Sequence, residues 1–187
     1  MQYWIDVSDW RAETERRVER GVAYFKQGYN CAQSVVLAFA DAYGLPQALA
    51  ARLPSSFGGG IGRMRETCGT ACGMFMLAGL EVADAQDAVM GDVDAATFNP
   101  YPDQEVKRKD YEVVQRLAAD FRAQAGSITC RELLGLNRRR ADGSLPEITI
   151  VATPEPRTDD YYRKRPCVRM VETAIRVYLR YLMEKYS

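Results

Sequence analysis

Histidine is absent from the 187 residues of this chain. A protein without imidazole cannot use Ser-His-Asp or Cys-His nucleophile pairs, and it cannot bind haem through histidine. Mixed Cys/His zinc sites and the HExxH metalloprotease motif are excluded for the same reason. Any soft-metal or redox chemistry must therefore rely on the five cysteines.

An excess of charge and long hydrophobic runs are also lacking. The 25 Lys and Arg residues balance 25 Asp and Glu residues, whereas nucleic-acid-binding proteins are generally basic, and the basic run 138–140 is too short to change this. The most apolar window, 74–80, is too short to cross a bilayer, and the first residues show no secretory signal pattern. We therefore expect a cytoplasmic protein, in a compartment that keeps thiols reduced, with no nucleic-acid or membrane partner.

The spacing of apolar residues predicts one all-α domain over residues 1–187. Apolar side chains recur at steps of three and four residues, which is typical of amphipathic helices. This pattern predicts a bundle of about six helices, with segments at 8–27, 30–43, 46–52, 67–79, 103–124, 130–134 and 166–185. Residues 84–102 are expected to be irregular, and residues 137–165 to form one long polar loop with at most a short strand at 147–151.

Four of the five cysteines fall where a helix is expected to begin. Asn30 precedes Cys31 and Thr129 precedes Cys130, and in both cases a Gln or Glu three residues after the cap completes a capping-box pattern. Cys68 follows Thr67 in the same way, and Cys167 follows a proline that suits the first helical position. The positive end of a helix dipole lowers a thiol pKa, so these positions favour a nucleophile, redox centre or metal ligand over a buried structural cysteine.

The fifth cysteine, Cys72, lies one helical turn after Cys68. It could be an extra metal ligand or a resolving thiol, and filling of the core is an equally good interpretation. Gly69 and Gly73 on the same segment leave a flat strip that a neighbouring helix or a ligand can approach closely.

A glycine-rich run occupies residues 57–63, and it matches neither a dinucleotide-binding nor a P-loop pattern. One interpretation is a loop of exposed N–H groups that brings Cys68 to an anionic centre, with Arg63 and Arg65 adding positive charge. The other is a tight turn that packing requires. On the first interpretation the candidate cofactor-binding residues are Gly59, Gly60, Gly62 and Arg63.

Together these motifs resemble the family of redox-active proteins named for its C-GCAxxG-C-C cysteine pattern. The resemblance rests on GYNCAQSV at 28–35, FGGGIGR at 57–63, CGTACG at 68–73, CREL at 130–133 and the final Cys167. It spans residues 20 to 175 and implies that Cys31, Cys68, Cys130 and Cys167 are the four family cysteines, the same four that the capping pattern selects. Thr70 stands where the motif has Ala, and Cys72 occupies a variable position.

The leading hypothesis is a redox protein, an oxidoreductase or an electron carrier, in which Cys31, Cys68, Cys130 and Cys167 converge. Four thiolates could bind an iron–sulfur cluster or a tetrahedral zinc ion, and two pairs could instead cycle between dithiol and disulfide. The redox partner, a protein or a small molecule, is not specified by the sequence.

A helical binding or oligomerisation module with structural cysteines is the alternative, and a homo-oligomer would then use Tyr178, Tyr181, Tyr186 and the long polar segment. A hydrolase is less favoured, because the chain has no SxxK motif and no well-spaced acidic pair.

Overall fold

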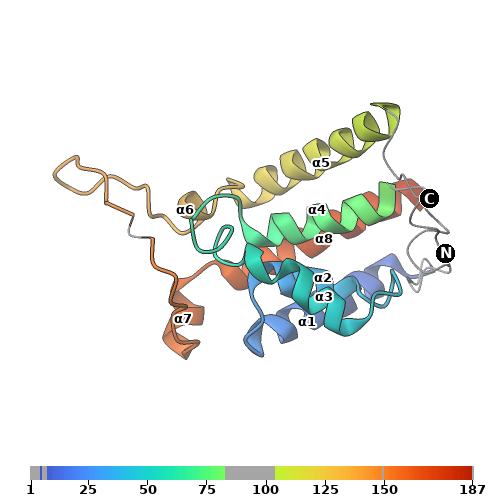
Figure 1. The fold of residues 1–187 in the computed structure, drawn as a ribbon, viewed down its shortest axis with the longest axis horizontal. Coiled ribbons are helices and arrows are strands. Elements are labelled where there is room, and N and C mark those ends of the chain that lie inside the picture. The colour runs from blue at the N-terminus through green and yellow to red at the C-terminus, as the bar shows by residue number, and fades with distance from the viewer. Residues whose placement is uncertain (1–4, 6–7, 83–103, 149, 187) are drawn as a thin grey trace, which may run out of the picture.

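The fold is an all-α bundle, as the apolar spacing predicts (Figure 1). The computed structural model describes residue 5 and residues 8–82, 104–148 and 150–186. Its helices are α1 (Trp10–Lys26), α2 (Cys31–Phe39), α3 (Gln47–Arg52), the 3-10 helix η1 (Leu53–Phe57), α4 (Gly69–Val82), α5 (Gln104–Ala125), α6 (Cys130–Leu133), α7 (Asp159–Lys164) and α8 (Cys167–Tyr186). The segment predicted to be irregular, 84–102, lies outside the described residues.

The core forms where α2, α4 and α8 meet, and α1 and α5 cover this centre. Val35 and Phe39 on α2, Leu77 on α4 and Ile175 on α8 are fully buried. Figure 1 shows α4 and α8 side by side, with α5 on one side of them and α1 to α3 on the other. The N-terminal ends of α4 and α8 lie at the same end of the bundle as α6, so residues at these helix starts are brought together.

The helix boundaries differ from the prediction at several ends. The N-cap of α1 is Asp9 rather than Ser8, since the Asp9 carboxylate accepts the N–H of Ala12 at 2.9 Å. The helix α2 ends at Phe39 instead of continuing to residue 43, and a turn follows. The short helix α7 lies within the segment that was expected to be a polar loop throughout.

No strand occurs among the described residues, and the predicted strand at 147–151 is wrong for the part of it that is described. The Val151 carbonyl accepts a hydrogen bond from the Arg63 side chain at 2.7 Å, rather than from a neighbouring backbone. An isolated bridge between Thr67 and Thr129 is the one β-type pairing in the described parts of the chain.

The close approach predicted for Gly69 and Gly73 is made by a helix. A Cβ atom on Gly73 would lie 2.8 Å from the Ala32 carbonyl oxygen, so Gly73 lets α2 and α4 pack backbone to backbone. A Cβ atom on Gly69 would lie 2.5 Å from the Phe57 carbonyl oxygen at the end of η1 and 3.1 Å from the Cys31 Cβ, so Gly69 admits both η1 and α2.

Two of the tyrosines proposed for an oligomer interface are unavailable for it. Tyr178 and Tyr181 are buried in the core of the bundle, and Tyr186 alone of the three is exposed. Among the described helices, none combines the length and the apolar character that a bilayer-spanning segment requires.

Candidate functional site

The structure brings the four candidate cysteines to one cavity at the end of the bundle where α4, α6 and α8 begin. This cavity has a volume of about 290 Å³, and Cys31, Cys68, Cys130 and Cys167 all line it. All five cysteines of the chain are free thiols. Residues far apart in the sequence thus share one small space, which the redox hypothesis requires.

Cys31 is the first residue of α2, as the capping pattern predicts. The Asn30 side chain accepts the N–H groups of Ala32 and Gln33 at 3.0 Å each, and the Gln33 side chain accepts the Asn30 N–H at 2.8 Å. This capping box fixes the start of α2 and hence the position of the thiol. The N–H of Gly59 donates to the Cys31 sulfur from the glycine loop.

Cys68 immediately precedes α4, which begins at Gly69 rather than at Cys68 itself. Its sulfur accepts the N–H groups of Thr70 and Ala71, so the cysteine side chain takes the role that was predicted for Thr67 as the cap. The Thr70 hydroxyl lies 3.2 Å from the same sulfur. Thr70 is the residue that departs from the family motif, and this departure therefore adds a polar contact to a family cysteine.

Cys130 begins α6, and a short antiparallel pairing holds it beside the residues that lead to Cys68. The N–H of Cys130 donates to the Glu66 carbonyl at 2.6 Å, and the N–H of Cys68 donates to the Ile128 carbonyl at 2.8 Å. Because alternate residues of paired extended segments point to the same side, Cys68 and Cys130 share one side of this pairing.

The predicted capping box at Thr129 is wrong. The Thr129 side chain caps no N–H group. Its partner in the predicted box, Glu132, instead accepts the Ser127 hydroxyl, and the Ser127 oxygen accepts the N–H of Thr129 at 2.9 Å. The Thr129 backbone is extended and pairs with Thr67, and this pairing sets the start of α6.

Cys167 is the first residue of α8, one position earlier in the helix than predicted, and it lies next to Cys31. The Cys31 thiol can donate to the Cys167 sulfur, and this interaction lowers the pKa of Cys167 below its ordinary value, with a smaller contribution from Arg165. The same interaction, together with burial, raises the pKa of Cys31 well above its ordinary value. The pair is therefore asymmetric, because one member tends to ionise and the other to keep its proton.

The expectation that every helix start lowers the thiol pKa is wrong for the other family cysteines. Burial raises the pKa of Cys68 to about 11, although the N–H groups of Thr70 and Ala71 oppose this shift. Burial likewise raises the pKa of Cys130 to about 11, against a smaller effect of Arg65. The loss of hydration outweighs the helix dipole at both sites.

Cys72 lies on α4 and does not line the cavity. Its sulfur is 4.0 Å from the Thr67 carbonyl, and burial raises its pKa to about 11. Its side chain is buried, and the neighbouring Cys130 and Cys31 thiols also act to raise its pKa.

The glycine loop is left-handed over most of its length, and it contacts Cys31 and Cys130 rather than delivering Cys68. The φ angles of Gly59, Gly60, Ile61, Gly62 and Arg63 are all between +55° and +76°. A Cβ atom on Gly60 would lie 2.5 Å from the Cys130 Cβ and 2.9 Å from the Glu66 nitrogen. The Gly60 contacts fit the interpretation that packing requires a tight turn. The Gly59 N–H does donate to a thiol, but to Cys31 and not Cys68, so the cofactor-binding role of the run stays a prediction.

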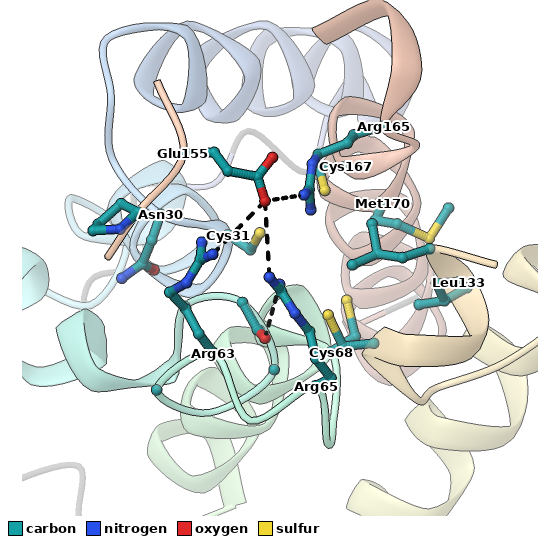
Figure 2. Close-up of a pocket in the computed structure, with 18 of the residues that line it drawn as sticks. Asn30, Cys31, Arg63, Arg65, Cys68, Leu133, Glu155, Arg165, Cys167 and Met170 are labelled. Carbon is teal, nitrogen blue, oxygen red and sulfur yellow. Dashed lines mark hydrogen bonds and ion pairs between the residues drawn. The ribbon is translucent and has the colours of Figure 1, made fainter. Parts of the chain in front are cut away.

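Four arginines among the described residues line the cavity; sequence reasoning singled out Arg63 and Arg65 and missed Arg157 and Arg165. Figure 2 shows the Glu155 carboxylate facing Arg63, Arg65 and Arg165. Burial acts to raise the pKa of Glu155, but the three arginines outweigh it and lower this pKa. The carboxylate comes from residues 150–157, a segment that we call the strap. The length of the polar region was the only sequence signal for it.

The fit of a single metal ion is poor. Among the residues that the structure describes, no three Cys, Asp or Glu side chains are grouped so that they could hold one metal ion. A tetrahedral zinc site needs four such ligands around one point, so the side chains as they stand do not form one.

Comparison with known protein families gives a match over most of the chain. No curated protein and no solved structure matches the chain. The sequence pattern of one family matches residues 29–181, and this range contains the cavity's four cysteines, the glycine loop and the strap. The chain belongs to this family, which is described as "Putative redox-active protein (C_GCAxxG_C_C)".

Proposed function

We propose that this protein is a thiol oxidoreductase in which Cys31 and Cys167 cycle between dithiol and disulfide. The observation that carries the proposal is the asymmetric pair, in which the pKa of Cys167 is lowered by the neighbouring Cys31 thiol beside an open cavity. Attacking thiols react as thiolates, and the lowered pKa gives Cys167 a larger thiolate fraction than an ordinary cysteine has at the same pH.

The reaction proceeds by two exchanges. The Cys167 thiolate attacks one sulfur of a partner disulfide, the partner S–S bond breaks, and the first partner thiolate leaves. The Cys31 sulfur then attacks the Cys167 sulfur and breaks the mixed disulfide. The Cys31 proton passes to the second partner thiolate, and the first partner thiolate takes up from water the proton that Cys167 had released. The partner disulfide thus gains two electrons and two protons and becomes two thiols, and Cys31 and Cys167 end as a disulfide.

Cys68 and Cys130 have no nucleophilic role in this proposal. With pKa values of about 11, both stay protonated near neutral pH. The pKa of Cys31 is raised as well, but Cys31 differs from these two because its thiol is hydrogen-bonded to the Cys167 sulfur that it attacks. The second dithiol pair of the sequence hypothesis is therefore not part of the mechanism, and these two residues form the cavity wall.

The test is oxidation of the reduced protein by a small disulfide, followed by mapping of thiols and cross-links by mass spectrometry. Wild type should lose two thiols and gain a Cys31–Cys167 link, and a Cys72→Ser control should do the same because Cys72 lies outside the cavity. Cys31→Ser should trap a mixed disulfide on Cys167, and Cys167→Ser should react slowly. Five thiols that persist in wild type, or a link between other cysteines, would overturn the proposal.

An iron–sulfur cluster is a second candidate, favoured by the fact that all four family cysteines line one cavity. Both [2Fe–2S] and [4Fe–4S] clusters accept four cysteine ligands, and bound iron would remove the thiol protons that burial retains. Such a cluster would supply one-electron transfer. Iron and acid-labile sulfide in anaerobically purified protein, lost in Cys68→Ser and kept in Cys72→Ser, would support this candidate over the dithiol mechanism.

The cellular setting of this chemistry is the cytoplasm in our proposal, because reduced thiols persist there. Oxidoreductase activity then needs a disulfide partner, either a small molecule or a protein. Self-association is the remaining alternative, and sedimentation of the reduced and oxidised forms tests it.

A further inference from the structure

The wall of the cavity carries an excess of positive charge. Its titratable side chains besides the cysteines and one tyrosine are four arginines and one carboxylate, namely Arg63, Arg65, Arg157, Arg165 and Glu155. Within the described part of the chain, no lysine or aspartate lines it. A small cavity with this charge balance attracts anions.

Arg157 has a donor that no described residue of the protein accepts. Its guanidinium lies over the rings of Phe25 and Tyr161. The guanidinium carbon is 4.3 Å from the centre of the Phe25 ring and 4.8 Å from the centre of the Tyr161 ring. One nitrogen, Nη2, donates to the Tyr29 carbonyl at 3.3 Å. The other, Nη1, is buried without an acceptor among the described residues. Buried donors of this kind are rare in folded proteins, and ligand binding is one explanation for them.

Arg63 and Arg65 are also incompletely paired. The Arg65 side chain is 8% exposed, yet its nitrogen lies 3.9 Å from the Glu155 carboxylate, and the Arg63 nitrogen lies 3.7 Å from it. Both distances exceed that of a normal hydrogen bond. Glu155 is held closely by Arg165 alone. The Arg63 Nε donates to the Val151 carbonyl at 2.7 Å, and the Arg65 Nη1 donates to the Gly59 carbonyl at 3.5 Å. These bonds use only part of each guanidinium, so both arginines keep N–H groups for a ligand.

The two sets of spare donors lie near different thiols. Arg157 is close enough to Cys31 for its charge to act on that thiol, and Arg65 interacts with Cys130. Apolar side chains complete the wall, among them Leu133 and Met170. An apolar wall with a few placed charges is typical of small-molecule sites, and about 290 Å³ suits a small ligand rather than a folded partner.

We propose that the cavity binds a small disulfide with a carboxylate at each end, one held by Arg157 and the other by Arg63 and Arg65. The disulfide part of this inference rests on the dithiol mechanism proposed above, whereas the dicarboxylate part does not. The ligand would enter with its sulfur atoms over the Cys31 and Cys167 pair.

The first experiment measures binding without redox chemistry. Suberate has the length of 3,3′-dithiodipropionate but carries methylene groups in place of the two sulfurs, so its binding by calorimetry reports the anion site alone. Wild type should bind it, and Arg157→Met should weaken binding about tenfold or more, since hydrogen bonds to charged groups are worth this much. Arg163→Met is the matched control, because Arg163 lies outside the cavity with a side chain that is 76% exposed.

A second variant guards against misfolding. Arg63→Met should weaken suberate binding while Arg157 and its ring contacts stay in place. The inference is overturned if wild type does not bind suberate, or if folded Arg157→Met and Arg63→Met both bind it as tightly as wild type.

The second experiment compares three disulfides of similar size and different charge. The dianion 3,3′-dithiodipropionate should oxidise the protein faster than neutral bis(2-hydroxyethyl) disulfide, and the dication cystamine should be slowest, with each rate divided by that for free dithiothreitol. Arg157→Met should reduce this preference. Equal normalised rates would overturn the substrate class. If suberate binds and none of the disulfides reacts, the dithiol mechanism fails and the anion site stands.

Discussion

Two glycines on α4 offer a matched test of how closely α2 and α4 approach. A Cβ atom on Gly73 would lie 2.8 Å from the Ala32 carbonyl oxygen and 3.1 Å from the Val35 Cβ, whereas one on Gly79 would meet nothing within 4 Å. Gly73→Ala and Gly79→Ala thus make the same chemical change on the same helix in opposite surroundings.

The two variants should change the free energy of unfolding in opposite directions. Alanine is favoured over glycine inside a helix by about 1 kcal/mol, so Gly79→Ala should stabilise the protein by about that amount. Gly73→Ala gains the same helix propensity, but its new Cβ meets the Ala32 carbonyl oxygen. Because a backbone oxygen cannot rotate away as a side chain can, α2 must move. Forcing extra atoms into a packed core costs roughly 1–3 kcal/mol, so the variants should differ by about that cost.

Urea unfolding followed by far-ultraviolet circular dichroism measures the difference. A shift of α2 also moves Cys31, which begins that helix, so Gly73→Ala should in addition slow the oxidation of the Cys31 and Cys167 pair. Equal stabilisation by the two substitutions would refute the close packing of α2 on α4.

Three further predictions concern the site. Gly60→Ala should lower the melting temperature more than Gly62→Ala. Both substitutions replace a left-handed glycine, at a cost of about 1–2 kcal/mol, but only at Gly60 would the new Cβ collide with its surroundings. Equal decreases in melting temperature would contradict this reasoning. Alkylation of Cys167 by iodoacetamide should have its midpoint at a lower pH than that of the other thiols, and Cys31→Ala should raise this midpoint; an unchanged midpoint would show that the Cys31 thiol does not lower the pKa. The lowered pKa of Glu155 means that its ion pairs stabilise the fold at pH values above the unfolded pKa of about 4.3, and that this stabilisation is lost as the pH falls through the folded pKa. Glu155→Gln should therefore be less stable than wild type by under about 1 kcal/mol at pH 7 and equally stable in acid. A difference in stability that persists in acid would argue against a stabilising role of these ion pairs.

Helix starts were predictable where local sequence controls them. At Cys31 the cap and its partner are three residues apart, and the capping box forms as predicted. At Cys130 the same pattern fails, because pairing with residues 65–68 holds Thr129 extended, and a contact over this sequence distance leaves no local pattern. Sequence reasoning also located the cysteines at helix starts but not the burial that raises most of their pKa values, since burial depends on how the helices pack.

The arginines and carboxylate at the cavity mouth were largely beyond prediction. Glu155 and Arg157 lie in the strap, which has no helical or strand period from which a facing direction could be deduced. Arg63 and Arg65 were singled out as positive charges only because they lie at the end of the glycine run. Nothing in the sequence indicated that Arg165, next to the final cysteine, would meet Glu155.

The positions of Cys31 and Cys167 near the two ends of the chain have a consequence for turnover of the protein. A covalent link between them would close most of the chain into a ring and remove much of the entropy of the unfolded state. For a loop of about 137 residues this is worth about 5 kcal/mol, although strain in the folded state can reduce it. The oxidised protein should then resist proteases far better than the reduced one, so that its lifetime reports the redox state of its surroundings.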